Sequence, residues 1–143
     1  MMPINPRYVL NDGKIILGKS SLENDVYDVL VFLCSQNKVT VPQSVKAIQK
    51  SAFCMCNNLR FVEFPENSQL QVIEEYAFES TTRQSISFPP HLSKIGPGLL
   101  LSSGSVQLIE LDDNSDLLNM SDYLLGFEQN VNIMIPVRFR NQF

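Results

Sequence analysis

Cys54 and Cys56, one residue apart, are the residues of this chain whose type and spacing come closest to a reactive site. A thiolate pair can bind zinc or take part in redox exchange. A single C-x-C without a second cluster is a weak zinc signal, because the chain has one further cysteine, Cys34, and one histidine, His91. We therefore predict a scaffold role for the pair and no metal, with a redox-sensitive thiol as the alternative.

Other catalytic patterns are absent from the sequence. It contains no G-x-S-x-G, Walker-type, H-E-x-x-H or G-x-G-x-x-G motif. His91, in FPPHLSKI, is predicted to be a solvated turn residue, and Asp112, Asp113 and Asp116 lack the spacing of a known calcium loop. We expect no enzymatic activity and no cofactor.

Composition and charge exclude further classes of function. The chain has 143 residues, 44% hydrophobic and 18% charged, which suits one domain with a single core. A net charge of -4 offers no basic stripe, so we do not expect nucleic acid as a partner. No apolar run approaches the roughly 18 residues of a membrane span, and MMPINPRYVLNDGK does not resemble a signal peptide. We expect no membrane insertion.

The cysteines belong to a repeat, which defines the elements that position them. Five apolar-x-apolar triplets followed by Pro or Asp recur, and their third residues are spaced by 23, 24, 23 and 24 residues. The triplets with the following residue are VTVP (39–42), VEFP (62–65), ISFP (86–89), IELD (109–112) and IMIP (133–136). Their alternation is typical of short strands with one buried face.

Each of the first four triplets is followed by an apolar pair three residues apart, and then by a large apolar residue. The pairs are Val45/Ile48, Leu70/Ile73, Leu92/Ile95 and Leu117/Met120, and the large residues are Phe53, Phe78, Leu100 and Leu125. The turn between triplet and pair alternates in length, with the longer form at 65–69 and 112–116. In QVIEEYAF (71–78) the spacing of Ile73, Ala77 and Phe78 fits one buried face of a short helix. The pattern predicts an α/β repeat solenoid in which short parallel strands alternate with short helices or turns.

Residues 38 to 136 resemble the BspA-like leucine-rich repeats. The resemblance is carried by VPQSVKAIQKSAFCMCNNLRFVEFP and FPENSQLQVIEEYAF, which match I-x-x-x-A-F-x-x-C-x-x-L followed by a strand and Pro. It implies that Cys56 packs in the turn before the strand, and later units carry Ser80 or Thr81, Ser103 and Glu128 there. A metal ligand would not be replaced so freely, and Cys54 is then an extra residue on the outer surface. The resemblance also implies a cell-surface antigen or adhesin, with a cytoplasmic location as the alternative.

The two ends of the chain differ from the repeats within this single domain. Residues 1–37 are predicted to form an N-terminal cap, because Asp-Gly within YVLNDGKIILGK (8–19) favours a β-hairpin. A partial repeat is predicted to follow. Val31 stands 10 residues before Val41, and the large apolar residues of the repeats stand at a similar distance before the third residue of the next triplet. The tail 137–143 alternates apolar and basic residues. Its apolar residues Val137, Phe139 and Phe143 are candidates for self-association.

The exposed face of the strands is the predicted binding surface. Ten outward residues are expected there: Lys38, Thr40, Phe61, Glu63, Ser85, Ser87, Leu108, Glu110, Asn132 and Met134. Phe61 and Leu108 beside carboxylates suit a protein or glycan partner, unless these two side chains pack on neighbouring loops. The sequence thus favours a non-enzymatic protein-binding or adhesion module. The alternative is a structural scaffold that self-associates through its solenoid ends.

Overall fold

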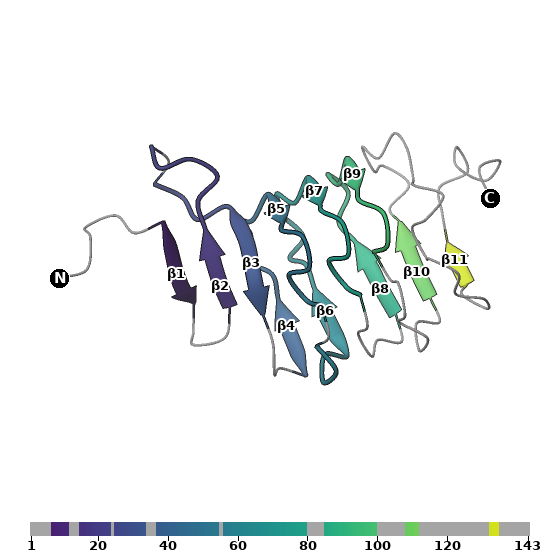
Figure 1. Cartoon of the computed structure of the whole chain (residues 1–143). Coiled ribbons are helices and arrows are strands. Elements are labelled where there is room, and N and C mark those ends of the chain that lie inside the picture. The colour runs from purple at the N-terminus through teal and green to yellow at the C-terminus, as the bar shows by residue number, and fades with distance from the viewer. Residues whose placement is uncertain are drawn as a thin grey trace.

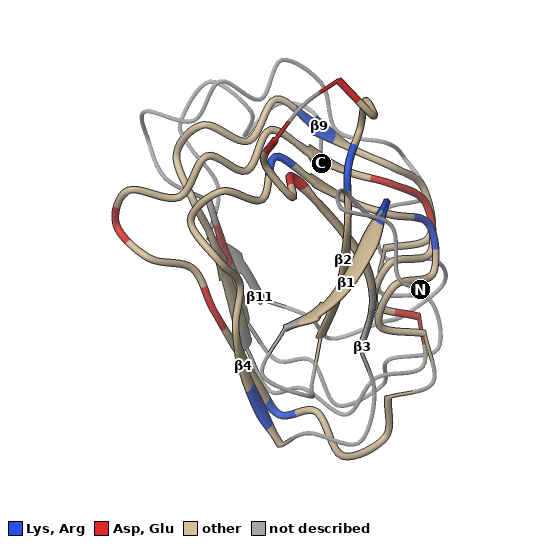
Figure 2. Ribbon diagram, turned by 90° about the vertical axis from the view of Figure 1, so that its left-hand side faces the viewer, with Lys and Arg blue, Asp and Glu red and all other residues tan. Residues whose placement is uncertain are grey.

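The chain forms a short solenoid of β-strands (Figure 1). In this computed structural model the described residues are 7–11, 15–23, 25–33, 37–54, 56–79, 85–99, 108–111 and 132–134. The strands lie in two walls on opposite sides of a buried core, as the view along the solenoid in Figure 2 shows for β4 and β3. The solenoid of short strands predicted from the repeat is thus the observed architecture.

The front wall consists of the predicted triplet strands. These are β4 (Lys38–Thr40), β6 (Phe61–Glu63), β8 (Ser85–Phe88), β10 (Leu108–Leu111) and β11 (Asn132–Met134). The pairs β4 with β6, β8 with β10 and β10 with β11 are parallel, and Lys38 lies opposite Phe61 as Ser85 lies opposite Leu108. The period of 23 to 24 residues therefore sets the register of these pairs, because one coil of that length returns the chain to the same position.

The back wall replaces the predicted helices. It contains β5 (Ala47–Ile48), β7 (Val72–Ile73) and β9 (Lys94–Ile95), which pair in parallel with their isoleucines in register. Among the described residues the structure has no helix, so of the predicted alternatives, short helices or turns, these coils contain turns. The burial pattern was right, since Ile73, Ala77 and Phe78 are fully buried. The short strand and the turn after it carry these side chains inward without a helix.

A left-handed residue at the same point of each coil explains why no helix forms. Ser51, Tyr76 and Gly98 have φ angles of 56°, 55° and 65°. A helix cannot continue through this conformation, which costs a non-glycine residue roughly 1–2 kcal/mol. We call the segments 49–54, 74–79 and 96–99 the turn column. Its coils are joined by backbone hydrogen bonds, including one from the Phe53 N–H to the Ala77 carbonyl (2.8 Å).

Gly98 allows the third coil to keep this turn. The sequence around it, IGPGLL, predicts an irregular turn in place of a helical one, and the structure has a turn there with the same left-handed position as the two preceding coils. A Cβ atom on Gly98 would overlap the ring of Tyr76 in the preceding coil. Glycine is therefore required here both for its φ angle and for the close approach of the neighbouring ring.

Phenylalanine side chains stack along the core next to the turn column. Phe53 and Phe78 are fully buried, and their rings lie 4.7 Å apart at 12°. The remaining core side chains are apolar residues from both walls and from the turns. They include Leu30, Val41, Val45, Ile48, Leu59, Leu70, Ile73, Leu92, Ile95 and Leu99.

The N-terminal hairpin forms as predicted and extends the back wall. β1 (Tyr8–Asn11) and β2 (Ile15–Gly18) are antiparallel, and β3 (Val29–Leu33) pairs antiparallel with β2 and parallel with β5. Leu30 lies opposite Ile48, so the alignment that placed Val31 with the large apolar residues is wrong. The role of the hairpin as a cap remains a prediction, because the edge strand β1 exposes Tyr8 (53%) and Leu10 (61%).

A buried carboxylate joins the hairpin to the first coil. Asp28 accepts hydrogen bonds from the Ser20 N–H (2.8 Å) and hydroxyl (2.6 Å), and its carbonyl accepts one from the Lys46 N–H (2.7 Å). Burial by itself raises the pKa of Asp28, but the Ser20 hydrogen bonds and the Lys46 charge lower the pKa below its usual value. The charged form of Asp28 thus stabilises this junction.

Candidate functional site

The described outward side chains of the front wall form a mixed apolar and charged surface. Lys38, Thr40 and Glu63 are exposed, and Phe61 is 54% exposed. Contacts with neighbouring residues therefore cover less than half of Phe61. Across β4 and β6 the Lys38 ammonium and the Glu63 carboxylate form an ion pair of 2.9 Å. This exposed pair orients both side chains beside Phe61 and contributes little stability.

The other predicted front-wall residues share the register of this surface. Ser85, Leu108 and Asn132 are aligned across β8, β10 and β11, as are Ser87, Glu110 and Met134. Ser87 is exposed and Glu110 is half-buried. For four of the predicted front-wall residues the structure describes the backbone but not the side chain: Ser85, Leu108, Asn132 and Met134. The tail candidates lie outside the described residues: Val137, Phe139 and Phe143.

The front wall is interrupted between β6 and β8, a feature that the sequence did not reveal to us. β4 pairs with β6, and β8 pairs with β10, but no ladder joins the described strands β6 and β8. On the back wall the same two coils are joined, because β7 pairs with β9. The ladder between these two coils is therefore missing on one side only.

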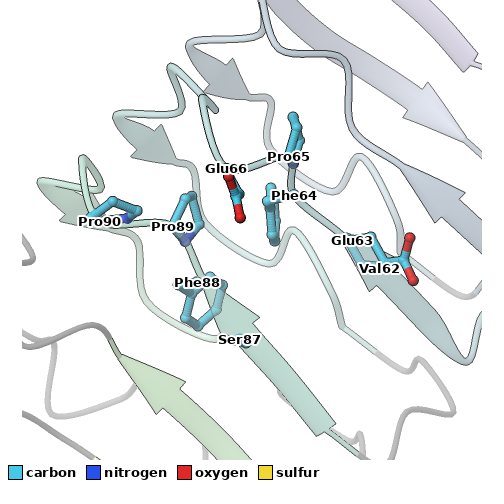
Figure 3. Close-up of a pocket in the computed structure, with 9 residues that line it drawn as sticks. All are labelled: Val62, Glu63, Phe64, Pro65, Glu66, Ser87, Phe88, Pro89 and Pro90. Atoms are coloured by element: carbon cyan, nitrogen blue, oxygen red, sulfur yellow. The ribbon is translucent and has the colours of Figure 1, made fainter.

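A pocket of about 370 Å³ lies at this interruption (Figure 3). The segments that line it are the ends of β6 and β8 and the turns that follow them: Val62, Glu63, Phe64, Pro65, Glu66, Ser87, Phe88, Pro89 and Pro90. The Phe64 and Phe88 rings are 6.5 Å apart and tilted by 41°, in contrast to the close Phe53 and Phe78 stack. Phe64 is only half-buried, so part of its ring is available to a ligand.

The alternation of turn lengths accompanies this hollow. The turn after β6 is the longer type and holds Glu66 and Asn67 in solvent, whereas the turn after β8 is short and contains Pro89 and Pro90. A long turn beside a short one leaves a step in the surface. The sequence contained this signal in the 65–69 turn, but it does not predict that the strands beneath it are unpaired.

The two described cysteines have structural surroundings. Cys56 is buried (1% exposed), as the resemblance implied, and both thiols are free. Cys54 is half-buried, not on the outer surface as predicted, and its thiol donates a hydrogen bond to the Glu79 carboxylate (3.8 Å). Burial raises the pKa of Cys54, and the charge and hydrogen bond of Glu79 raise it further. A raised pKa disfavours the thiolate that redox or metal chemistry requires.

Other groups that could carry chemistry are dispersed. In the described part of the chain no three His, Cys, Asp or Glu side chains gather where they could hold a metal ion. His91 is exposed on a turn, as predicted, and lines a second, polar pocket of about 390 Å³ with Lys46, Gln69, Gln71 and Ser93. Cys34, Asp112, Asp113 and Asp116 lie outside the described residues, as do the later Cys56 equivalents.

Among the residues that the structure describes, no helix is long and apolar enough to cross a membrane.

Comparisons with known proteins agree with the repeat architecture. A model of the BspA type leucine-rich repeat region matches residues 27–139 in six copies. A leucine-rich repeat protein from Eubacterium ventriosum is similar in structure, with a TM-score of 0.68 and 15% identity over 91% of this chain and 40% of that chain. The pneumococcal vaccine antigen PcpA gives a TM-score of 0.58 and 21% identity over 78% of this chain and 28% of that chain. The chain thus spans less than half the length of either structure, and no curated protein matches it.

Proposed function

Because the chain belongs to the BspA-type leucine-rich-repeat family, whose repeat domains are protein-interaction modules, we propose that it is a non-enzymatic recognition module. Its front wall would contact a macromolecular partner, protein or glycan. The observation that carries this proposal is the exposed aromatic ring of Phe61 beside the Lys38 and Glu63 ion pair. Exposed aromatic residues next to oriented charges are typical of binding surfaces.

A cell-surface or extracellular location is part of the same proposal. The family resemblance supports it, and a cytoplasmic location is the alternative. Detection of the native protein on intact cells by a specific antibody, without permeabilisation, would support the surface location. Detection only after permeabilisation would favour the cytoplasm.

Binding through the front wall can be tested with variants on the two walls. An array of extracellular matrix and cell-surface proteins and glycans would first identify a ligand. We expect the Phe61→Ser/Glu63→Lys double variant to bind it at least tenfold more weakly, because it removes the aromatic contact and reverses a charge. Lys94→Glu, an exposed charge reversal on the back wall, should leave the affinity unchanged. Equal affinity of the double variant and the wild type would refute the front-wall assignment.

Self-association through a solenoid end is a second candidate function. It is supported by β1, an edge strand that exposes Tyr8 and Leu10 and pairs only with β2 among the described strands. Such an edge can pair with the edge of another chain. Light scattering across a hundredfold concentration range should show a dimer that Leu10→Lys abolishes. A monomer throughout the range would exclude this candidate.

A further inference from the structure

We propose that the pocket between β6 and β8 binds a Lys or Arg side chain carried by an extended segment of a protein ligand. The inference rests on the proposed function, because it assigns a partner chemistry to one part of the recognition surface. It depends on the shape of the pocket, its apolar lining and the charges at its rim.

The apolar lining suits the aliphatic stem of a long side chain. Phe64, Phe88, Pro65 and Pro89 come from both coils and enclose the hollow without contributing a hydrogen-bond donor from their side chains. A volume of about 370 Å³ is at the small end of the roughly 300–1,000 Å³ found for ligand sites. The pocket is thus suited to one side chain of a larger ligand. The exposed part of the Phe64 ring can also contact a cation through its face.

The charges at the rim select a cation. Glu63 is already paired with Lys38, and in Figure 3 its side chain points away from the hollow. Glu66 is drawn between Phe64 and Pro89, and no Lys or Arg of the described residues lies within ion-pair distance of it. An incoming ammonium or guanidinium group would find in Glu66 a carboxylate that no Lys or Arg of the described residues already pairs with.

The remaining lining explains why other ligands fit less well. Among the described lining residues, the side chains that can form hydrogen bonds are those of Glu66, Ser87 and, at the rim, Glu63, so this part of the lining has no side-chain amide or basic group. An acidic segment would be repelled by the Glu66 carboxylate. A neutral oligosaccharide would find few of the mixed donors and acceptors that its hydroxyl groups require. A basic side chain satisfies both the apolar surface and the charge.

Titration with defined peptides tests the inference without knowledge of the natural partner. The probes are acetyl-tetraarginine amide, acetyl-tetraglutamate amide and cellotetraose, followed by the backbone amide resonances of Phe64, Glu66 and Phe88. We expect only the arginine peptide to shift these resonances in a saturable way. Glu66→Gln should weaken its binding about twofold to fivefold, as expected for loss of an exposed ion pair, and Glu66→Lys about tenfold. Both variants should fold normally, because Glu66 is an exposed turn residue.

A matched variant separates local recognition from the overall acidity of the chain. Glu23 is an exposed turn residue between β2 and β3, so Glu23→Lys makes the same change in net charge away from the pocket. It should alter the affinity by less than twofold. Equal effects of Glu23→Lys and Glu66→Lys would overturn the inference, as would saturable shifts of the pocket resonances with cellotetraose or tetraglutamate. The proposed function would survive either result if the front-wall double variant still lost its ligand and Glu66→Lys did not.

Discussion

The step from the second to the third coil has two different sides. On the back wall β7 and β9 are paired, and in the turn column the Phe78 N–H donates to the Leu99 carbonyl at 3.1 Å. On the front wall β6 and β8 are not paired, and the phenylalanines at their ends are tilted and separated. The contrast teaches that backbone pairing on one side of the repeat joins these two coils, while the strands on the other side stay unpaired beside a pocket.

The largest expected effect comes from removing a ring from each side. Phe53→Ala should lower the free energy of unfolding by about 3–5 kcal/mol, because it leaves a cavity on the side where the back wall and the turn column join the coils, which we call the closed side. Phe64→Ala should cost about 1–2 kcal/mol, because that ring is half-buried beside an open pocket. Urea unfolding measures both, with the exposed Phe61→Ala as a control within about 0.5 kcal/mol of wild type. Equal losses at Phe53 and Phe64 would remove the distinction between the two sides.

The turn column offers a second way to break the closed side. Gly98→Ala should destabilise the chain by about 2–3 kcal/mol, because it combines a left-handed φ angle with overlap of the Tyr76 ring. Ser51→Gly should act in the opposite direction and stabilise it by up to about 1 kcal/mol. Thermal unfolding of both variants is the measurement. A neutral Gly98→Ala would mean that the turn relaxes without cost.

The junction at Asp28 sharpens the comparison, because it extends the closed side to the hairpin. Asp28→Asn should lower the free energy of unfolding by about 1–2 kcal/mol through weaker hydrogen bonds with Ser20. Since the folded pKa of Asp28 lies below its unfolded value of 3.8, its contribution is fully present above that value and is lost as the pH falls through the folded pKa. Urea unfolding between pH 7 and pH 2.5 should show the variant and wild type converging. If the difference in free energy of unfolding between variant and wild type did not change with pH, the contribution of the charged Asp28 side chain would be refuted.

The smallest expected effect is on the reactivity of the Cys54 thiol, which lies in the turn column where the first two coils meet. Glu79→Gln removes a negative charge and lowers the pKa of the thiol, so iodoacetamide should modify Cys54 about two to five times faster at pH 8. The stability should change by less than about 0.5 kcal/mol. Peptide mapping by mass spectrometry separates Cys54 from Cys56, which should react only after unfolding. An unchanged Cys54 rate would show that Glu79 does not influence this thiol.

The repeat pattern predicts burial better than it predicts conformation. A spacing such as that of Ile73, Ala77 and Phe78 fits a helical face, yet a two-residue strand followed by a turn buries the same side chains. The left-handed position could be suspected from Gly98, but Ser51 and Tyr76 give no such signal in the sequence. Tertiary pairing across the back wall decides the outcome, and that pairing is not a local property.

The candidate surface was predictable where it follows from alternation along a strand. Phe61 and Glu63 flank the inward Val62, so their outward direction follows from the period of two. The pocket was not predictable in this way, because it lies between two unpaired strands of different coils and the turns that follow them. Cys54 was misplaced for a related reason, since its partner Glu79 lies 25 residues away in the next coil.

In mechanical terms, the missing ladder between β6 and β8 makes this step the compliant point of the described solenoid. A tensile load along the axis would pass through the back wall and the turn column, where hydrogen bonds connect successive coils. The front of the solenoid has no such load path at this step. Bending should therefore be concentrated there, with the front wall opening and closing as the back wall keeps its length.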